Sequence, residues 1–105
     1  PYIVVNDGGS GFRPAWIMIK RITADENWFI FSSKTDVDNP AEHYYLGDGT
    51  NAENDGSGGN DIDFTANGFK CRSTNAGTNN TGTYMYLAMA EHPFGGDGVA
   101  QAKAR

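Results

Sequence analysis

AWIMIKRITADENWFIFSS, residues 15–33, is the stretch that decides the fold. Two apolar runs, 15–22 and 28–33, stand on either side of the short polar segment ADEN (24–27). Runs rich in isoleucine and aromatic residues that are bounded by turn residues are typical of β-strands. The stretch therefore predicts two antiparallel strands joined as a hairpin through 24–27.

The first run is apolar on both of its sides. Trp16 and Met18 point one way, and Ile17 and Ile19 point the other, because successive residues of a strand face opposite sides. Such a pattern is typical of a strand inside a sheet, so we predict a central strand at 15–22. We also predict that five aromatic side chains belong to the core: Trp16, Trp28, Phe29, Phe31 and Phe69.

Shorter runs with a period of two recur along the rest of the chain. Fourteen glycines and many Asn, Asp, Ser and Thr residues separate them, and no helical period extends beyond two turns. The pattern and the composition predict a single all-β domain over residues 1–105, an antiparallel β-sandwich of about seven strands with Gly-rich turns. Beyond the hairpin, the predicted strands are 2–5, 43–46, 62–64, 68–73 and 83–91.

The last of these runs, TYMYLAMAE (83–91), follows a turn rich in Gly and Asn. It alternates between two apolar sides, so we predict a central strand buried on both faces, with Ala88 and Ala90 leaving room for a facing sheet. Glu91 and His92 could form an acid–base pair, but neighbours on a strand point to opposite faces. We therefore interpret them as the end of the strand.

The charge of the chain limits its partners. Thirteen acidic and eight basic residues give a net charge of -5, which repels phosphate backbones and argues against nucleic-acid binding. No apolar run approaches the roughly 20 residues of a membrane helix. The single cysteine, Cys71, excludes an intrachain disulfide and is predicted to be a small buried hydrophobic residue.

The two ends of the chain have their own signals. Residues 95–105 are small and polar and are predicted to form an extended tail. The chain opens on Pro1 without an initiating methionine, which we interpret as a piece of a longer protein.

Residues 47–61 consist almost entirely of small and polar residues and are predicted to form an exposed loop. Calcium binds six to eight oxygen atoms, often in loops of this composition. Asp55, Asp61 and Asp63 are therefore candidate calcium ligands, and a solvated loop without a cation is the alternative. No other cofactor is predicted.

Tyr44 and Tyr45 stand beside this loop and can supply an aromatic surface on which a sugar stacks. With Asp48 and Asp55 they form a candidate site for a glycan or receptor. Adjacent residues of a strand face opposite ways, so at most one tyrosine is expected to be exposed on a given face. Packing inside the protein is the alternative role for both.

The sequence contains no recognisable catalytic motif, whether a nucleophile elbow, a Cys/His pair or a phosphate-binding loop. We therefore predict that the chain is not an enzyme. The alternative is a glycan-cleaving domain that uses two carboxylates roughly 5–9.5 Å apart. Its candidates are Asp48, Asp55, Asp61, Asp63 and Glu91.

Two longer segments resemble a domain that is widespread in virion proteins of tailed bacteriophages, especially marine phages. The first is GFRPAWIMIKRI…NWFIFSS (11–33), with Gly-Phe-x-Pro, a strand ending in Ile-Lys-Arg and a strand containing Trp. The second is DIDFTANGFKCRSTNAGTNNTGTYMYLAMAEHPFGG (61–96), with Asp-x-x-x-x-Gly-Phe, Thr-Tyr-x-Tyr-x-Ala and Glu-x-Pro-Phe. The resemblance covers roughly residues 11–105. It implies a concanavalin A-like or laminin G-like (jelly-roll) sandwich and no transferable catalytic residues.

The resemblance implies a structural or adhesive module on the exterior of a phage particle, in a tail fibre or another appendage. It also implies a homo-oligomer, a trimer if the module sits in a fibre, in contact with other virion proteins. Attachment to host-surface glycans and pure assembly, including capsid decoration, are the two competing roles. Exposed aromatic residues beside the loops would favour attachment, and a large apolar patch would favour assembly.

Overall fold

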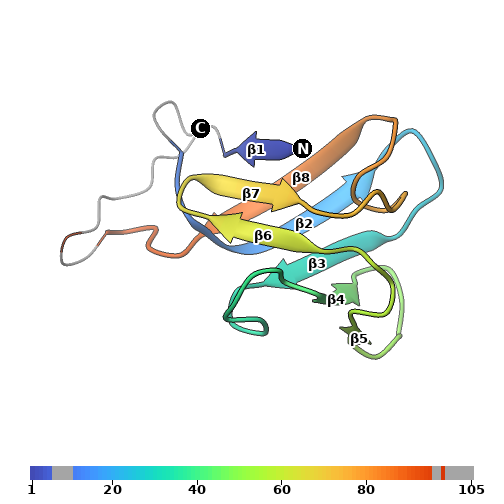
Figure 1. The fold of residues 1–105 in the computed structure, drawn as a ribbon, viewed down its shortest axis with the longest axis horizontal. Helices are drawn as coiled ribbons and strands as arrows, with labels where there is room; N and C mark the ends of the chain where they lie inside the picture. Colours follow the sequence, from blue (N-terminus) through green and yellow to red (C-terminus); the bar gives the residue numbers. More distant parts are fainter. Residues whose placement is uncertain (6–10, 96–97, 99–105) are drawn as a thin grey trace.

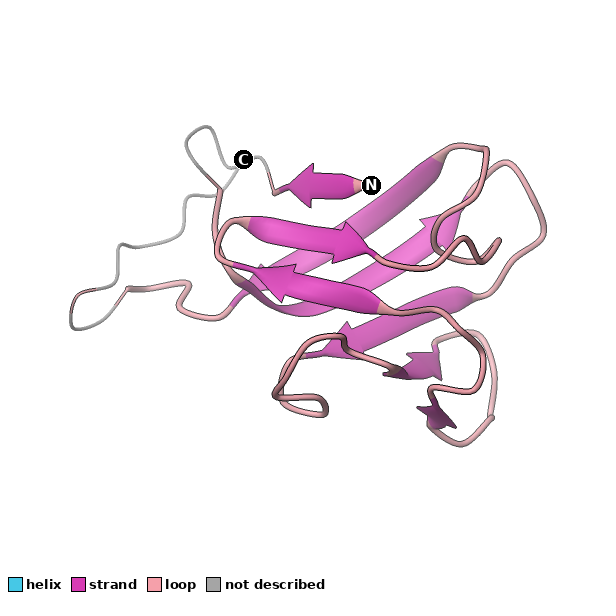
Figure 2. Cartoon of the chain, in the orientation of Figure 1, coloured by secondary structure: helices cyan, strands magenta, loops and turns pink. Residues whose placement is uncertain are grey.

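The computed structural model describes residues 1–5, 11–95 and 98, so the tail predicted at 95–105 lies almost wholly outside the described residues. The described residues form two antiparallel sheets, ordered β1-β7-β6 and β5-β4-β3-β2-β8, and none of them is helical (Figures 1 and 2). The predicted all-β class is confirmed. The strands are β1 (Tyr2–Val4), β2 (Pro14–Arg21), β3 (Trp28–Ser32), β4 (His43–Leu46), β5 (Asn54–Asp55), β6 (Ile62–Thr65), β7 (Gly68–Cys71) and β8 (Tyr84–Ala90).

The predicted hairpin is present as β2 and β3. Ile17 lies opposite Phe31 and Ile19 lies opposite Phe29, and all four side chains are buried. β2 also pairs with β8 on its other side, so its predicted place inside a sheet is confirmed.

The core lies between the two sheets. The prediction of a core position is confirmed for Phe29, Phe31 and Phe69 and is wrong for Trp16 and Trp28, which are only half-buried. The two tryptophans lie on the opposite face of the same strands, because β2 and β3 direct their isoleucine and phenylalanine side chains inward. The buried apolar cluster consists of Val5, Ile17, Ile19, Phe29, Phe31, Ala41, Tyr44, Ile62, Phe64, Phe69 and Cys71.

β8 departs from the prediction of a central strand buried on both faces. It lies at the edge of the five-stranded sheet, and Met85, Leu87 and Met89 on one of its faces are 48%, 49% and 53% exposed. Its other face carries Tyr84 and Ala88, which pack against the core. The alternation of apolar residues indicates how the two faces of a strand are covered. It does not indicate whether both backbone edges of the strand are hydrogen-bonded to neighbours, which is what makes a strand central.

One side of the sandwich is closed by the segment that leads into β4. Asn39 acts like a strand partner of β6: its Nδ2 donates to the carbonyl of Phe64 (2.8 Å), and the Phe64 amide donates to its Oδ1 (2.9 Å). Ala41 and Ile62 exchange two further backbone hydrogen bonds. The opposite side of the sandwich lies between the edge strands β1 and β8 (Figure 1).

The predicted exposed loop at 47–61 is largely exposed but has an ordered part. It contains the short strand β5, and Asn60 within it is buried with an exposed fraction of 3%. Asn60 donates to the Tyr44 hydroxyl (3.4 Å) and accepts a hydrogen bond from the Thr78 hydroxyl (3.1 Å). The polar composition of 47–61 predicts an exposed loop, but this hydrogen-bond network buries its C-terminal end.

Candidate functional site

The outer face of the five-stranded sheet is the face turned away from the three-stranded sheet. On β2 and β8 it is built from three cross-strand pairs, Trp16–Met89, Met18–Leu87 and Lys20–Met85. The same alternation that buries Ile17 and Ile19 places these side chains outside.

The apolar surface continues across β3 and β4. Met18 lies beside Ile30 of β3, and Ile30 lies beside Tyr45 of β4, which is 45% exposed. A row of large apolar side chains therefore crosses four neighbouring strands. We call it the outer stripe, which comprises Trp16, Met18, Ile30, Tyr45, Met85, Leu87 and Met89.

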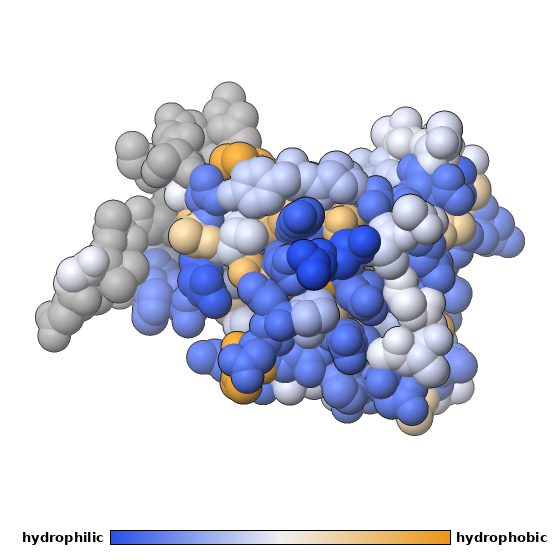
Figure 3. Space-filling view, in the orientation of Figure 1, coloured by the Kyte–Doolittle hydropathy of each residue, from blue (hydrophilic) through white to orange (hydrophobic). Residues whose placement is uncertain are grey.

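The three-stranded sheet presents a different surface. Its exposed side carries Lys70 and the ion pair between Arg72 and Asp63, whose nitrogen and oxygen are 3.2 Å apart. Figure 3, which looks onto β6 and β7, shows a mainly hydrophilic surface there. The two outer faces therefore differ in character, and a contiguous apolar surface is the kind of feature that marks an interaction site.

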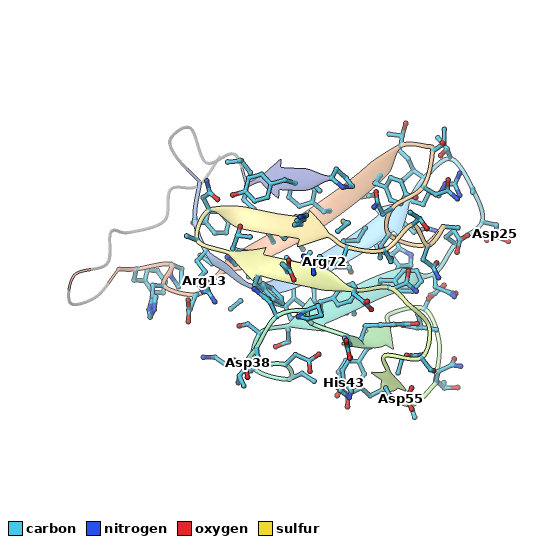
Figure 4. The ribbon with its side chains drawn as sticks, viewed as in Figure 1. Arg13, Asp25, Asp38, His43, Asp55 and Arg72 are labelled. Carbon is cyan, nitrogen blue, oxygen red and sulfur yellow. The ribbon has the colours of Figure 1, made fainter. Side chains whose placement is uncertain are left out.

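The candidate calcium ligands do not converge. Asp55 accepts a hydrogen bond from the Ser57 amide (3.2 Å) and lies beside His43, away from Arg72 (Figure 4). Asp63 is paired with Arg72, and Asp61 has a buried Oδ1 without a hydrogen-bond partner. Within residues 1–5, 11–95 and 98, no three His, Cys, Asp or Glu residues gather as a metal site would require.

The candidate glycan site is divided between two surfaces. Tyr44 is only 5% exposed, and its ring packs against Phe29 and Phe31 with centroid separations of 5.2 and 5.7 Å. The ring of Tyr44 therefore belongs to the core, which is the alternative role named for it above. Tyr45 lies on the outer face, while Asp48 accepts a hydrogen bond from the Trp28 amide (3.3 Å).

The carboxylate at the end of β8 has a structural partner. Glu91 forms an ion pair with Arg13 at 3.1 Å, and its amide donates to the Arg13 carbonyl at 2.9 Å. β8 ends at Ala90, so Glu91 and His92 follow the strand as predicted. Cys71 is buried as predicted, and burial raises the pKa of its thiol.

Asp36 and His43 form a pair that the sequence analysis missed. Asp36 Oδ1 lies 2.9 Å from His43 Nδ1, and Asp36 Oδ2 accepts hydrogen bonds from the amides of Glu42 and His43 at 2.9 and 2.7 Å. The carboxylate thus ties the preceding loop to the start of β4. Burial acts to raise the pKa of Asp36, but these hydrogen bonds outweigh it and hold the pKa below 3.8.

The hydrogen bond with Asp36 raises the pKa of His43 above its ordinary value of 6.5. The stabilisation from His43 is therefore complete below pH 6.5 and is lost as the pH rises through the folded-state pKa. The stabilisation from the Asp36 carboxylate is present above pH 3.8 and is lost as the pH falls through the lowered pKa of Asp36. We expect the pair to stabilise the loop most between these limits.

An NMR titration of the His43 ring tests this expectation. The pKa of His43 should fall toward 6.5 in Asp36→Asn. Asp38→Asn removes the same charge two residues away from an exposed side chain, and it should leave the titration of His43 close to that of the wild type. Equal effects of the two substitutions would show that net charge, not the Asp36 hydrogen bond, sets the pKa.

The fold and the surface define a two-sheet β-domain with one hydrophilic outer face and one apolar outer face. The chain belongs to the family described as a domain of unknown function, DUF7483, whose model matches residues 8–93. Neither the curated proteins nor the solved structures contain a match to it. In the described part of the chain, no helix is long and apolar enough to cross a membrane.

Proposed function

We propose that this chain is a non-catalytic structural module of a bacteriophage virion, located in a tail fibre or another exterior appendage. The module functions in virion assembly, and its outer stripe packs against a neighbouring virion protein. The resemblance of 11–33 and 61–96 to tailed-phage virion domains supports the setting. The two antiparallel sheets and their Gly-rich turns support a sandwich of the jelly-roll or concanavalin A/laminin G-like type.

The outer stripe is the observation that carries the proposal. Met85, Leu87, Met89 and Tyr45 are each about half exposed, on a face that is also apolar at Met18, Ile30 and Trp16. Covering the exposed half of one such side chain is worth about 1 kcal/mol. A partner that covers the stripe therefore gains several kcal/mol.

Enzymatic activity is not part of the proposal. Four of the five candidate carboxylates of a glycan-cleaving site have local partners: Asp48 at the Trp28 amide, Asp55 at the Ser57 amide, Asp63 at Arg72 and Glu91 at Arg13. The fifth, Asp61, has a buried oxygen without a hydrogen-bond partner, and such a site needs two carboxylates. Glycan attachment is the second candidate, and the exposed ring of Tyr45 supports it. Because Tyr44 lies in the core, however, Tyr45 is the one tyrosine of the candidate glycan site whose ring is exposed for a sugar to stack on.

Cryo-electron microscopy of the intact particle tests the proposal. We expect each copy to bury the outer stripe against a neighbouring protein while the hydrophilic face of β6 and β7 remains in solvent. Copies at the tip of an appendage with Tyr45 and the 47–61 loop pointing outward would instead favour attachment, and the assembly role would then be wrong. Absence of the chain from purified particles would refute the virion setting altogether.

A further inference from the structure

The free backbone edge of β8 adjoins the outer stripe, to which β8 contributes Met85, Leu87 and Met89. The Ile22 amide donates to the Thr83 carbonyl at 2.9 Å, and the register continues through Lys20–Met85 and Met18–Leu87. Residues of an antiparallel strand alternate between bonding to one neighbour and to the other. The backbone groups of 84, 86 and 88 therefore point away from β2, and no described strand pairs with them.

This edge lacks the usual protection against another strand. Natural edge strands are commonly blocked by charged residues, proline or a bulge in the exposed stretch. Residues 83–90, TYMYLAMA, contain no charged residue, no proline and no glycine, and the bulge on β2 lies at the far end, between Pro14 and Trp16. A seven-residue strand with an apolar, unblocked edge is a template for pairing with another chain.

The sandwich is also open beside this edge. A cavity of about 160 Å³ lies between β1 and β8, lined among others by Ile3, Phe69, Tyr84 and Tyr86. The ring of Tyr86 packs edge-on against Phe69 at 5.2 Å, yet Tyr86 remains 40% exposed. A strand added to β8 would extend its inward side chains over this opening.

We propose that the edge of β8 pairs antiparallel with β8 of a second copy of this chain, about a two-fold axis at Leu87. That register places Tyr86 opposite Ala88 and Tyr84 opposite Ala90 of the second copy, so that each large inward side chain meets a small one. On the outer face, Leu87 meets Leu87 and Met85 meets Met89. The two five-stranded sheets become one continuous sheet.

Charge at this edge does not oppose a second copy. Each chain carries a net charge of -5, so two copies repel one another over most approaches. The edge of β8 brings together no acidic side chains, because the paired positions are Tyr, Met, Leu and Ala. Pairing of this kind is isologous and closes at two copies, in contrast to the three-fold arrangement that a fibre implies.

Analytical ultracentrifugation of the full chain with charge-swapped variants tests the inference. The fraction of wild-type chain in the dimer should rise as the protein concentration is raised to about 100 µM, as expected for a dissociation constant in the micromolar range. Leu87→Lys and Leu87→Glu each place like charges on the axis and should weaken the dimer at least about tenfold. An equimolar mixture of the two variants should restore it. Val37→Lys, at a loop position that is 79% exposed, is the matched control and should leave it unchanged.

A cysteine variant keeps the test decisive if a charged side chain disturbs the strand. Residues directly opposite in a non-hydrogen-bonded pair have Cα atoms about 4.5 Å apart, within the range of a disulfide. Leu87→Cys should therefore form a covalent dimer on mild oxidation, whereas Val37→Cys should not.

Several results would overturn the pairing. They are a wild type that stays monomeric at the highest concentration, a trimer that Leu87→Lys leaves intact, and a mixture of variants that fails to recover the dimer. Leu87 belongs to the outer stripe as well as to the edge of β8, so the Leu87 variants test the dimer and not the proposed function. Burial of the stripe by another virion protein is tested separately, with the wild-type chain in the particle.

Discussion

Replacing Phe31 with alanine is expected to lower the free energy of unfolding by about 3–5 kcal/mol, the usual cost of removing a fully buried aromatic ring. Phe31 is completely buried, lies opposite Ile17 in the hairpin and packs against the ring of Tyr44. The substitution removes contacts from both the β2–β3 pair and β4. Urea unfolding followed by circular dichroism measures the loss.

Trp28→Ala is the matched control on the same strand. Trp28 lies on the outer face and is half-buried, so its loss should cost about 1–2 kcal/mol, well below the cost at a fully buried site. A larger loss at Trp28 than at Phe31 would mean that the faces of the sheet are assigned the wrong way round. The outer stripe would then be core, and the proposed docking face would not exist.

The hairpin and the division of its side chains into two faces could be predicted from the sequence. Ile17 and Ile19 alternate with Trp16 and Met18, and a strand allows only one arrangement of such neighbours. Which of the two apolar faces becomes the core was not predictable in the same way. That choice depends on which face the sheet of β6 and β7 covers, and both strands lie more than 40 positions after the end of β2.

The position of β8 at the edge of its sheet could not be predicted from the sequence for a related reason. Its residues alternate as those of a central strand would, and nothing in residues 83–91 records whether a neighbour pairs on the far side. The sequence also leaves open which of Tyr44 and Tyr45 is buried. Alternation indicates that they face opposite ways, but only the pairing of Tyr45 with Ile30 shows which one is outside.

No sequence pattern predicts the Asp36–His43 pair, because its contact depends on the path of a loop.

A sheet that is apolar on both faces has a consequence for function. Within the described residues, the three-stranded sheet covers one face of the five-stranded sheet, and the other retains half-exposed methionine, leucine and tyrosine side chains. Within those residues, the two-sided apolar pattern of the β2 sequence is therefore fully buried on one face only. For this reason the pattern that misplaced Trp16 in the core is itself an argument for an assembly role.

Gly68→Ala is expected to detach β1 from β7 and to cost about 2–3 kcal/mol, the range of substitutions that overfill a packed site. A Cβ at Gly68 would lie 1.9 Å from the carbonyl oxygen of Ile3, and this backbone atom cannot turn aside as a side chain can. β1 must therefore move, and Ile3 leaves its contact with the core. Gly49→Ala is the control, since the one close contact of its new Cβ would be the side-chain oxygen of Asn51 in an exposed loop, which can move aside.

Hydrogen-exchange rates of the backbone amides show which part of the structure is destabilised in Gly68→Ala. The Val5 amide donates to the Asn67 carbonyl at 3.0 Å, and the Cys71 amide donates to the Pro1 carbonyl at 2.9 Å. Both amides should exchange faster in Gly68→Ala, while the amides of the β2–β3 hairpin keep most of their protection. Because β1 borders the cavity beside β8, its detachment should also expose Tyr86 and Phe69. Unchanged exchange at Val5 and Cys71 would show that β1 tolerates the methyl group and that the close approach to Ile3 is wrong.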